Sequence, residues 1–133
     1  MLLVETYLQQ TTRKGIGLFA RNLIPAGTTW WVRSETFDRI VTPLQFVDYA
    51  PIQQIFIETY GCLEETGNWY LYMDDSRFVN HSDKIQSYNT FDAYNLLQGC
   101  TFIRDILPNE EIVCDYREYC CKSKDDLGFI NQE

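Results

Sequence analysis

The sequence predicts a single domain, residues 1–133, that is mainly β with a small helical insert. Short segments rich in β-branched and aromatic residues recur between clusters of turn-forming residues, which is typical of strands in small sheets. One stretch in the middle, about residues 41–66, changes to helical spacing. The chain is 45% hydrophobic and 15% aromatic, enough to bury a packed core and to argue against disorder.

The first third of the chain predicts a small antiparallel β unit. The expected strands and the turns between them are Leu2–Leu8, Thr11–Gly15, Ile16–Ala20, Asn22–Gly27 and Thr28–Val32, in that order.

The middle of the chain predicts two short helices, or one kinked helix. Thr42, Pro43 and Gln45 fit the N-cap, the first helical position and the third position of a capping box. Pro51 interrupts the pattern, which then resumes and ends at Gly61, a residue suited to follow a helix.

The last part of the chain returns to β structure. The expected segments are a strand at Trp69–Met73, a strand at Arg77–Ser82, a hairpin of Tyr88–Leu97 and Cys100–Ile106 around Gln98–Gly99, and a final strand at Glu111–Tyr116. The tail, residues 117–133, is charged with a late apolar patch.

The charge and the apolar pattern narrow the class of partner. The formal net charge is −8, which argues against direct binding to a nucleic-acid backbone. An acidic surface favours a basic partner, or it has no role beyond keeping the protein in solution. No apolar run is long enough to span a membrane, and the start of the chain lacks the features of a signal peptide.

The cysteines predict an intracellular protein. There are five, without CxxC pairs, a pattern that indicates reduced thiols and no zinc site. The adjacent Cys120 and Cys121 are most simply small buried residues, and a redox role is the alternative.

The segment Arg77–Ser82 ends in three compact hydrogen-bonding groups, which suits a small polar ligand. They are Asn80, His81, the only histidine in the chain, and Ser82. The alternatives are a strand end capped by its own side chains or a histidine satisfied in the core. A metal site is not expected, because there is no second histidine and no cysteine nearby in sequence.

Two further segments carry candidate site residues. Gly15 and Gly17 lack a Cβ, so the backbone there can approach a ligand; a tight hairpin is the alternative. Asp115 and Tyr116 end the last strand on an acid and a phenol, which can orient or deprotonate an amine. Tyrosines also simply pack well at strand ends.

Taken in order, these segments resemble the SET-domain family of protein lysine methyltransferases. The matching segments are Lys14–Ala20 and Ile24–Gly27 for the GxG opening, Arg77–Ser82 with Asn89 for the RFxNHS…N signature, and Arg104–Ile106, Pro108–Ile112 and Asp115–Tyr116 for the RDI…GEE(I/L)…DY ending.

The resemblance implies a β-clip of small curled antiparallel sheets around the helical insert. It also implies a knot-like crossing, rare in proteins, in which the segment after the last strand threads past the NHS segment. The implied cofactor is S-adenosylmethionine, and the implied product is a methylated lysine ε-amine in a basic protein or histone-like tail. A catalytically silent SET-like module that binds a peptide or protein is the alternative. A β domain without cofactor is a weaker one.

The resemblance also assigns site residues. Tyr116 is the implied catalytic tyrosine. The implied cofactor-binding residues are Lys14, Gly15, Ile16, Gly17, Arg77, Phe78, Asn80, His81 and Tyr116. Tyr119 and one of Tyr70 or Tyr72 are expected to line the substrate channel, and the small Cys114 is expected to leave room there for more than one methyl group.

Several residues depart from the family pattern. Asp83 replaces a cysteine, and no CxC pattern follows Tyr116, so the zinc-bearing segment after the domain is absent. The chain therefore resembles the short stand-alone SET proteins of bacteria and viruses. Its own tail would close the cofactor or substrate side, with Phe129 near the adenine. Asn109 stands where the family usually has glycine.

Overall fold

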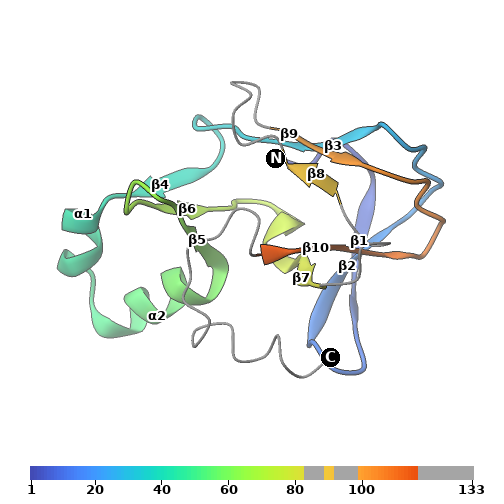
Figure 1. Cartoon of the computed structure of the whole chain (residues 1–133). Helices are drawn as coiled ribbons and strands as arrows, with labels where there is room; N and C mark the ends of the chain where they lie inside the picture. The colour runs from blue at the N-terminus through green and yellow to red at the C-terminus, as the bar shows by residue number, and fades with distance from the viewer. Residues whose placement is uncertain (83–88, 92–98, 117–133) are drawn as a thin grey trace.

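The computed structural model describes residues 1–82, 89–91 and 99–116, which form small sheets with a helical insert at one side (Figure 1). The sheets have the strand orders β1-β2-β10-β7, β3-β9-β8 and β4-β6-β5. The elements are β1 Thr6–Gln10, β2 Ile16–Ala20, β3 Thr29–Val32, β4 Arg39–Val41, α1 Pro43–Asp48, α2 Pro51–Tyr60, β5 Gly61–Leu63, β6 Trp69–Leu71, a 3-10 helix η1 Asp75–Phe78, β7 Asn80–His81, β8 Asn89–Phe91, β9 Gly99–Phe102 and β10 Glu111–Cys114.

The first sheet joins the two ends of the described chain. β2 pairs antiparallel with both β1 and β10, so that Leu18 lies opposite Leu8 and Ile112. β10 then pairs in parallel with β7, matching Val113 with Asn80. The mainly β class of small sheets is confirmed, and β7 with β10 adds one parallel pair to the expected antiparallel ones.

The second sheet corrects the predicted hairpin. β8 and β9 are antiparallel as expected, but Phe91 pairs with Cys100. A two-residue turn at Gln98–Gly99 would instead place residue 97 opposite residue 100. Residues 92–98 therefore belong to a longer connection, which lies outside the described residues. The turn dipeptide was a weaker guide to the register than the pairing of the strand interiors.

The third sheet carries the helical insert, and its predicted helix start is confirmed. Gln45 donates its backbone N–H to the Thr42 hydroxyl over 3.2 Å, and its side chain accepts the Thr42 N–H over 2.9 Å. Gly61 ends α2, but its φ is −89°, so it is not needed for a left-handed turn. It is needed for space, because a Cβ there would lie 2.5 Å from the carbonyl oxygen of Ile57.

The strand predicted at Arg77–Ser82 is mostly wrong. Its first part is the 3-10 helix η1, and only Asn80 and His81 are extended and paired. The Asp74 carboxylate caps η1 by accepting the Ser76 backbone N–H over 3.0 Å. This local hydrogen bond offers the backbone an alternative to a strand.

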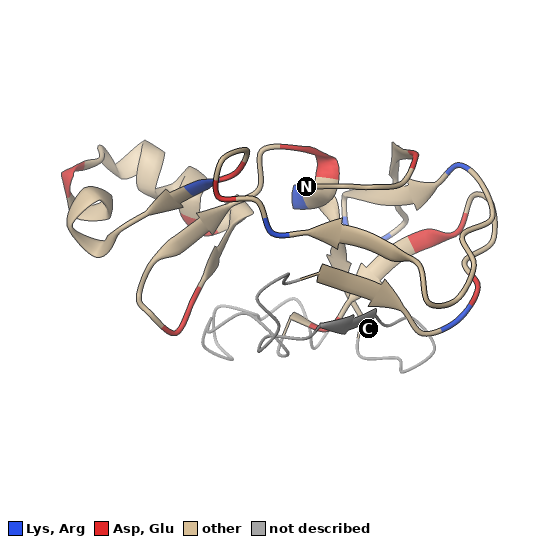
Figure 2. Cartoon of the chain, turned by 90° about the horizontal axis from the view of Figure 1, so that it is seen from above, with Lys and Arg blue, Asp and Glu red and all other residues tan. Residues whose placement is uncertain are grey.

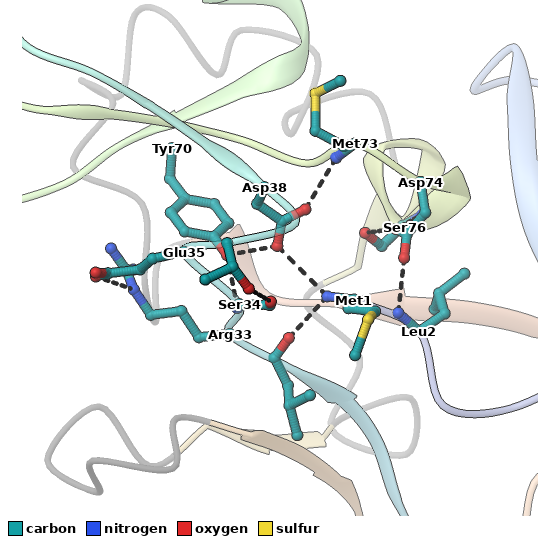
Figure 3. A network of polar contacts seen from close by, with 12 residues as sticks. Met1, Leu2, Arg33, Ser34, Glu35, Asp38, Tyr70, Met73, Asp74 and Ser76 are labelled. Atoms are coloured by element: carbon teal, nitrogen blue, oxygen red, sulfur yellow. Dashed lines mark hydrogen bonds and ion pairs between the residues drawn. The ribbon is translucent and has the colours of Figure 1, made fainter.

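A buried polar network fixes the approach to η1 (Figure 3). Asp38, whose side chain is fully buried, accepts the Tyr70 hydroxyl, the Met73 backbone N–H and, at 3.5 Å, the Met1 amino group. Asp74 accepts the backbone N–H of Leu2 over 2.7 Å. The network ties the segment before β1 to the segment that enters the NHS sequence.

Two apolar clusters form the core of the described residues. The larger one spans the first two sheets and includes Leu18, Phe102 and Ile112, each 1% exposed or less. The smaller one joins the insert to its own sheet through Val41, Ile57 and Leu71. The predicted knot-like crossing involves residues after 116, which lie outside the described residues, so it stays a prediction.

Candidate functional site

The parallel pairing of β7 and β10 places Tyr116 over the NHS segment. The backbone N–H of Tyr116 donates to His81 Nδ1 over 3.1 Å, and the two rings meet edge to face with centroids 5.4 Å apart. The Tyr116 hydroxyl donates to the carbonyl oxygen of Val79. Both ends of the tyrosine are therefore held by residues that precede it by more than thirty positions.

His81 lies beneath Tyr116 and is 2% exposed. Its Nδ1 accepts the Tyr116 N–H and also lies 3.6 Å from the Asp115 carboxylate. A neutral imidazole that accepts at Nδ1 carries its proton on Nε2. The carbonyl oxygen of His81 accepts the Lys14 ammonium over 2.5 Å, which brings that cation to the same strand.

The two positions of the GxG segment require glycine for different physical reasons: Gly15 for its backbone conformation and Gly17 for lack of space. Gly15 is exposed, has a φ of +69°, and a Cβ there would meet nothing within 4 Å. This backbone is open to a ligand. Gly17 is buried, and its Cβ would lie 2.6 Å from Glu111 Oε1 and 3.1 Å from Asn80 Nδ2.

Glu111 is a candidate site residue that the sequence patterns did not single out. Its Oε1 accepts the Asn80 side-chain amide over 2.9 Å, directly above Gly17. Asn80 also donates to the carbonyl oxygen of Ile16 over 3.3 Å. The second acid of Glu110-Glu111 was the available signal, but only the register of β10 against β2 and β7 shows which of the two acids reaches Asn80.

Tyr60, at the end of α2, is a second residue that the patterns missed. Its ring meets the Phe78 ring edge to face at 6.0 Å, and the Arg77 guanidinium lies 5.9 Å from its centre. The Phe56 ring also packs against Tyr60, with centroids 5.0 Å apart. The helical insert therefore reaches the predicted cofactor residues Arg77 and Phe78 through this tyrosine.

The predicted channel residues divide into separate groups. Tyr70 is 2% exposed, and its hydroxyl donates to Asp38 and accepts the Ser34 N–H. Burial, with the bond to Asp38, raises the pKa of Tyr70. Tyr72 is half-buried against Trp31. The assignment of one of these two tyrosines to the channel stays a prediction.

The remaining candidates are Cys114, Tyr119 and the residues of the tail. Cys114 is 5% exposed in the large cluster, against which Tyr116 also packs. Tyr119, Cys120, Cys121 and Phe129 lie outside the described residues. In the described part of the chain, no cluster of three histidine, cysteine or acidic residues is arranged to hold a metal, and no helix has both the length and the apolar character to cross a membrane.

Residues 15–117 match the family model of the SET domain, which is most of the chain. The chain belongs to the SET-domain family. This family includes methyltransferases, and the family's cofactor in general is S-adenosylmethionine. A search of curated protein sequences found no match.

Solved structures agree on the fold. An apo form of the ctPRC2 complex with two substitutions in Ezh2 aligns with a TM-score of 0.65 at 21% identity, over 93% of this chain and 16% of that one. A humanized mutant of the Chaetomium thermophilum Polycomb Repressive Complex 2, bound to an inhibitor, gives 0.61 at 20%, over 90% and 16%. A putative histone methyltransferase of Plasmodium falciparum gives 0.55 at 16%, over 84% and 96%.

The two Polycomb chains are much longer than this chain, whereas the Plasmodium chain is of similar length. This chain spans 16% of the two Polycomb chains but corresponds to nearly the whole Plasmodium chain. At these identities the likeness establishes the fold alone.

Proposed function

We propose that this protein is an S-adenosylmethionine-dependent protein-lysine N-methyltransferase. The observation that carries the proposal is the placement of Tyr116. Its hydroxyl donates to the Val79 carbonyl, one residue before Asn80, while its backbone is held by His81. The predicted catalytic and cofactor segments, which are far apart in sequence, thus meet at one place.

The residues around this point fit the cofactor. The exposed backbone at Gly15 has space for a ligand. Asn80 offers an amide oxygen as an acceptor, and Lys14 offers a cationic donor. When bound, S-adenosylmethionine supplies an electrophilic methyl group on a positively charged sulfur. Arg77 and Phe78 belong to η1, which comes directly before β7 in the chain, and they are proposed to contact the cofactor as well.

The protein must present the lysine as a neutral amine. With a reference pKa near 10.4, only about one lysine in 2,500 is neutral at pH 7, a cost of roughly 4.6 kcal/mol. A poorly solvated site beside a positive charge lowers the lysine pKa without a strong base. The ammonium proton would leave to solvent, and the neutral amine could then form the new nitrogen–carbon bond as the bond from the methyl carbon to sulfur breaks, which leaves S-adenosylhomocysteine.

Tyr116 is proposed to orient that amine. The Tyr116 hydroxyl donates to the Val79 carbonyl oxygen, and a phenol oxygen can accept an amine N–H at the same time as it donates. Holding the amine in line with the methyl group lowers the entropic part of the barrier. Tyr72 and Tyr119 are proposed to line the channel.

The substrate is proposed to be a basic protein or a histone-like tail. The net charge of −8 favours encounter with a basic partner. Figure 2 shows that the acidic residues of the described chain are spread over several elements, so the attraction is general and is not focused on one patch. The five cysteines of the sequence, which include no CxxC pair, favour an intracellular place of action, either cytoplasmic or, if the target is a histone, nuclear or in a host cell.

Calorimetry and a transfer assay test the proposal. The protein is expected to bind S-adenosylmethionine and S-adenosylhomocysteine and to label one or more proteins in a mixture of basic proteins. Tyr116→Phe removes the hydroxyl but keeps the ring against His81. It is expected to lower transfer at least about a hundredfold, a loss of ~2.7 kcal/mol of transition-state stabilisation, and to leave binding within about threefold.

Other outcomes are equally clear. Full activity in Tyr116→Phe would remove the tyrosine from the mechanism. Binding of the cofactor with no transfer to any basic protein would favour the silent peptide-binding module. Absence of cofactor binding would leave a SET fold with another use.

The small Cys114 leads to an expected product. It lies two residues before Tyr116 in the same cluster, where a small side chain leaves room. Mass spectrometry of a methylated peptide is therefore expected to show dimethyl or trimethyl lysine at long times, and Cys114→Phe is expected to shift the product toward monomethyl lysine. Only monomethyl product from the natural protein would contradict this.

A further inference from the structure

We propose that Glu111 recognises the α-ammonium group of the cofactor, both through its own charge and by fixing the orientation of Asn80. This inference rests on the proposed use of S-adenosylmethionine and adds a residue to that site. S-Adenosylmethionine and its demethylated product both end in an α-ammonium and an α-carboxylate, so a site for them needs groups of both charges.

The orientation of the Asn80 amide follows from its partners. Its nitrogen lies 2.9 Å from Glu111 Oε1 and 3.3 Å from the Ile16 carbonyl oxygen. Both partners can only accept hydrogen bonds, so the amide must turn its NH2 group to them. The amide oxygen is then the arm turned away from Glu111, and it offers an acceptor that suits an ammonium.

Gly17 makes this arrangement possible. β10 is in register with β2 so that Glu111 pairs with Phe19, and the carboxylate extends along the strand to a point above Gly17. A Cβ at Gly17 would lie 2.6 Å from that carboxylate oxygen. The absence of a Cβ at Gly17 therefore leaves space for the contact between the side chains of Glu111 and Asn80.

The charges around Asn80 and His81 match a zwitterion. Glu111 places an anion against the side chain of Asn80, and Lys14 places a cation on the backbone carbonyl of His81. Two adjacent residues of β7 are therefore contacted by groups of opposite charge. Lys14 is the corresponding candidate for the α-carboxylate.

The experiment compares two ligands that differ by one group. S-Adenosylhomocysteine carries the ammonium, and its desamino analogue keeps the adenosine and the carboxylate but lacks the amine. Glu111→Gln keeps the size of the side chain and an oxygen for Asn80, and it removes the charge. Glu65→Gln, at an exposed position in the turn after β5, is the matched control for the loss of one negative charge.

Calorimetry is expected to show that Glu111→Gln weakens S-adenosylhomocysteine binding about tenfold or more, the range for a hydrogen bond to a charged group. The same variant should bind the desamino analogue within about twofold of the natural protein. Glu65→Gln should bind both as the natural protein does. Thermal unfolding confirms that each variant is folded.

The other outcomes contradict the inference in separate ways. Equal weakening of both ligands would make Glu111 only a structural support of the sheet, and no weakening would remove it from the site. Whether or not Glu111→Gln folds, a natural protein that does not prefer S-adenosylhomocysteine over the desamino analogue by about tenfold would also contradict the inference. If the natural protein binds neither ligand, the proposed function fails together with this inference; if it binds but transfers no methyl group, only the proposed reaction fails.

Discussion

At the scale of single residues, the site depends on which groups share a hydrogen bond rather than on which groups are reactive. His81 is the only histidine in the sequence, yet its Nδ1 accepts a hydrogen bond from the Tyr116 backbone N–H and so helps to position Tyr116. Glu111 has an ordinary acidic side chain, but it determines how Asn80 turns. In both cases a residue acts by orienting its neighbour.

The two glycines of the GxG segment are predicted to respond differently to alanine. Gly15→Ala has space but must keep a φ of +69°, so unfolding in urea should show a loss of stability of about 1–2 kcal/mol. Gly17→Ala places its Cβ against Glu111 and Asn80, so calorimetry should show a larger loss of S-adenosylhomocysteine affinity than in Gly15→Ala. Equal affinities of the two variants would show that the contact above Gly17 does not matter for binding.

At the scale of elements, the insert and the NHS segment are connected by α2. This helix begins at Pro51 and ends against Gly61, and its last residue, Tyr60, packs on Phe78. A substitution that moves the end of α2 should therefore shift the residues of the candidate site and also lower the stability of the third sheet.

Gly61→Ala tests this junction. The new Cβ would lie 2.5 Å from the Ile57 carbonyl and 3.0 Å from Leu71 Cδ2, so the helix and strand must separate. We expect a loss of about 1–3 kcal/mol in the free energy of unfolding, as for other overpacked positions, measured by urea titration. Glu65→Ala, exposed in the next turn, should stay within about 0.5 kcal/mol of the natural protein. A Gly61→Ala variant as stable as this control would mean that the junction adjusts freely.

At the scale of the whole molecule, buried and half-buried carboxylates hold the N-terminal segment and the turns in place. Burial works against the charge of Asp74, but hydrogen bonds from Ser76 and Leu2 outweigh it and keep its pKa below the ordinary value of 3.8. Burial likewise opposes the charge of Glu110, and the bidentate bond with Arg104 keeps its pKa below 4.5.

These pKa shifts predict a loss of stability in acid. A carboxyl group whose pKa is lower in the folded protein stabilises it above the unfolded pKa and loses that contribution as the pH falls through the folded pKa. Tm should thus be nearly constant near neutral pH and fall as the pH drops below 4.5 and then below 3.8. Asp74→Asn should lower Tm near neutral pH and make it less sensitive to acid. A Tm that stays constant from about pH 6 to about pH 3 would contradict the assignment.

The family, the mainly β class and the helix start at Thr42 could be predicted from the sequence, because each rests on local patterns. A capping box involves residues three positions apart, and the three SET motifs are recognisable in order along the chain. Asn109 illustrates a local rule in the same way: its φ is +65°, a conformation that asparagine tolerates better than most residues, which explains why it can stand in place of glycine.

Only the tertiary structure decided how these motifs meet. The parallel pairing of β7 with β10, the contact of Glu111 with Asn80 across 31 positions, and the packing of Tyr60 on Phe78 all depend on strand register and core packing. Register is set by which faces are buried together, and a single strand does not carry that information. The sequence alone therefore determined which segments matter, and the fold decided that Tyr116 stands over Val79 and His81 while Tyr70 is held in the core by Asp38.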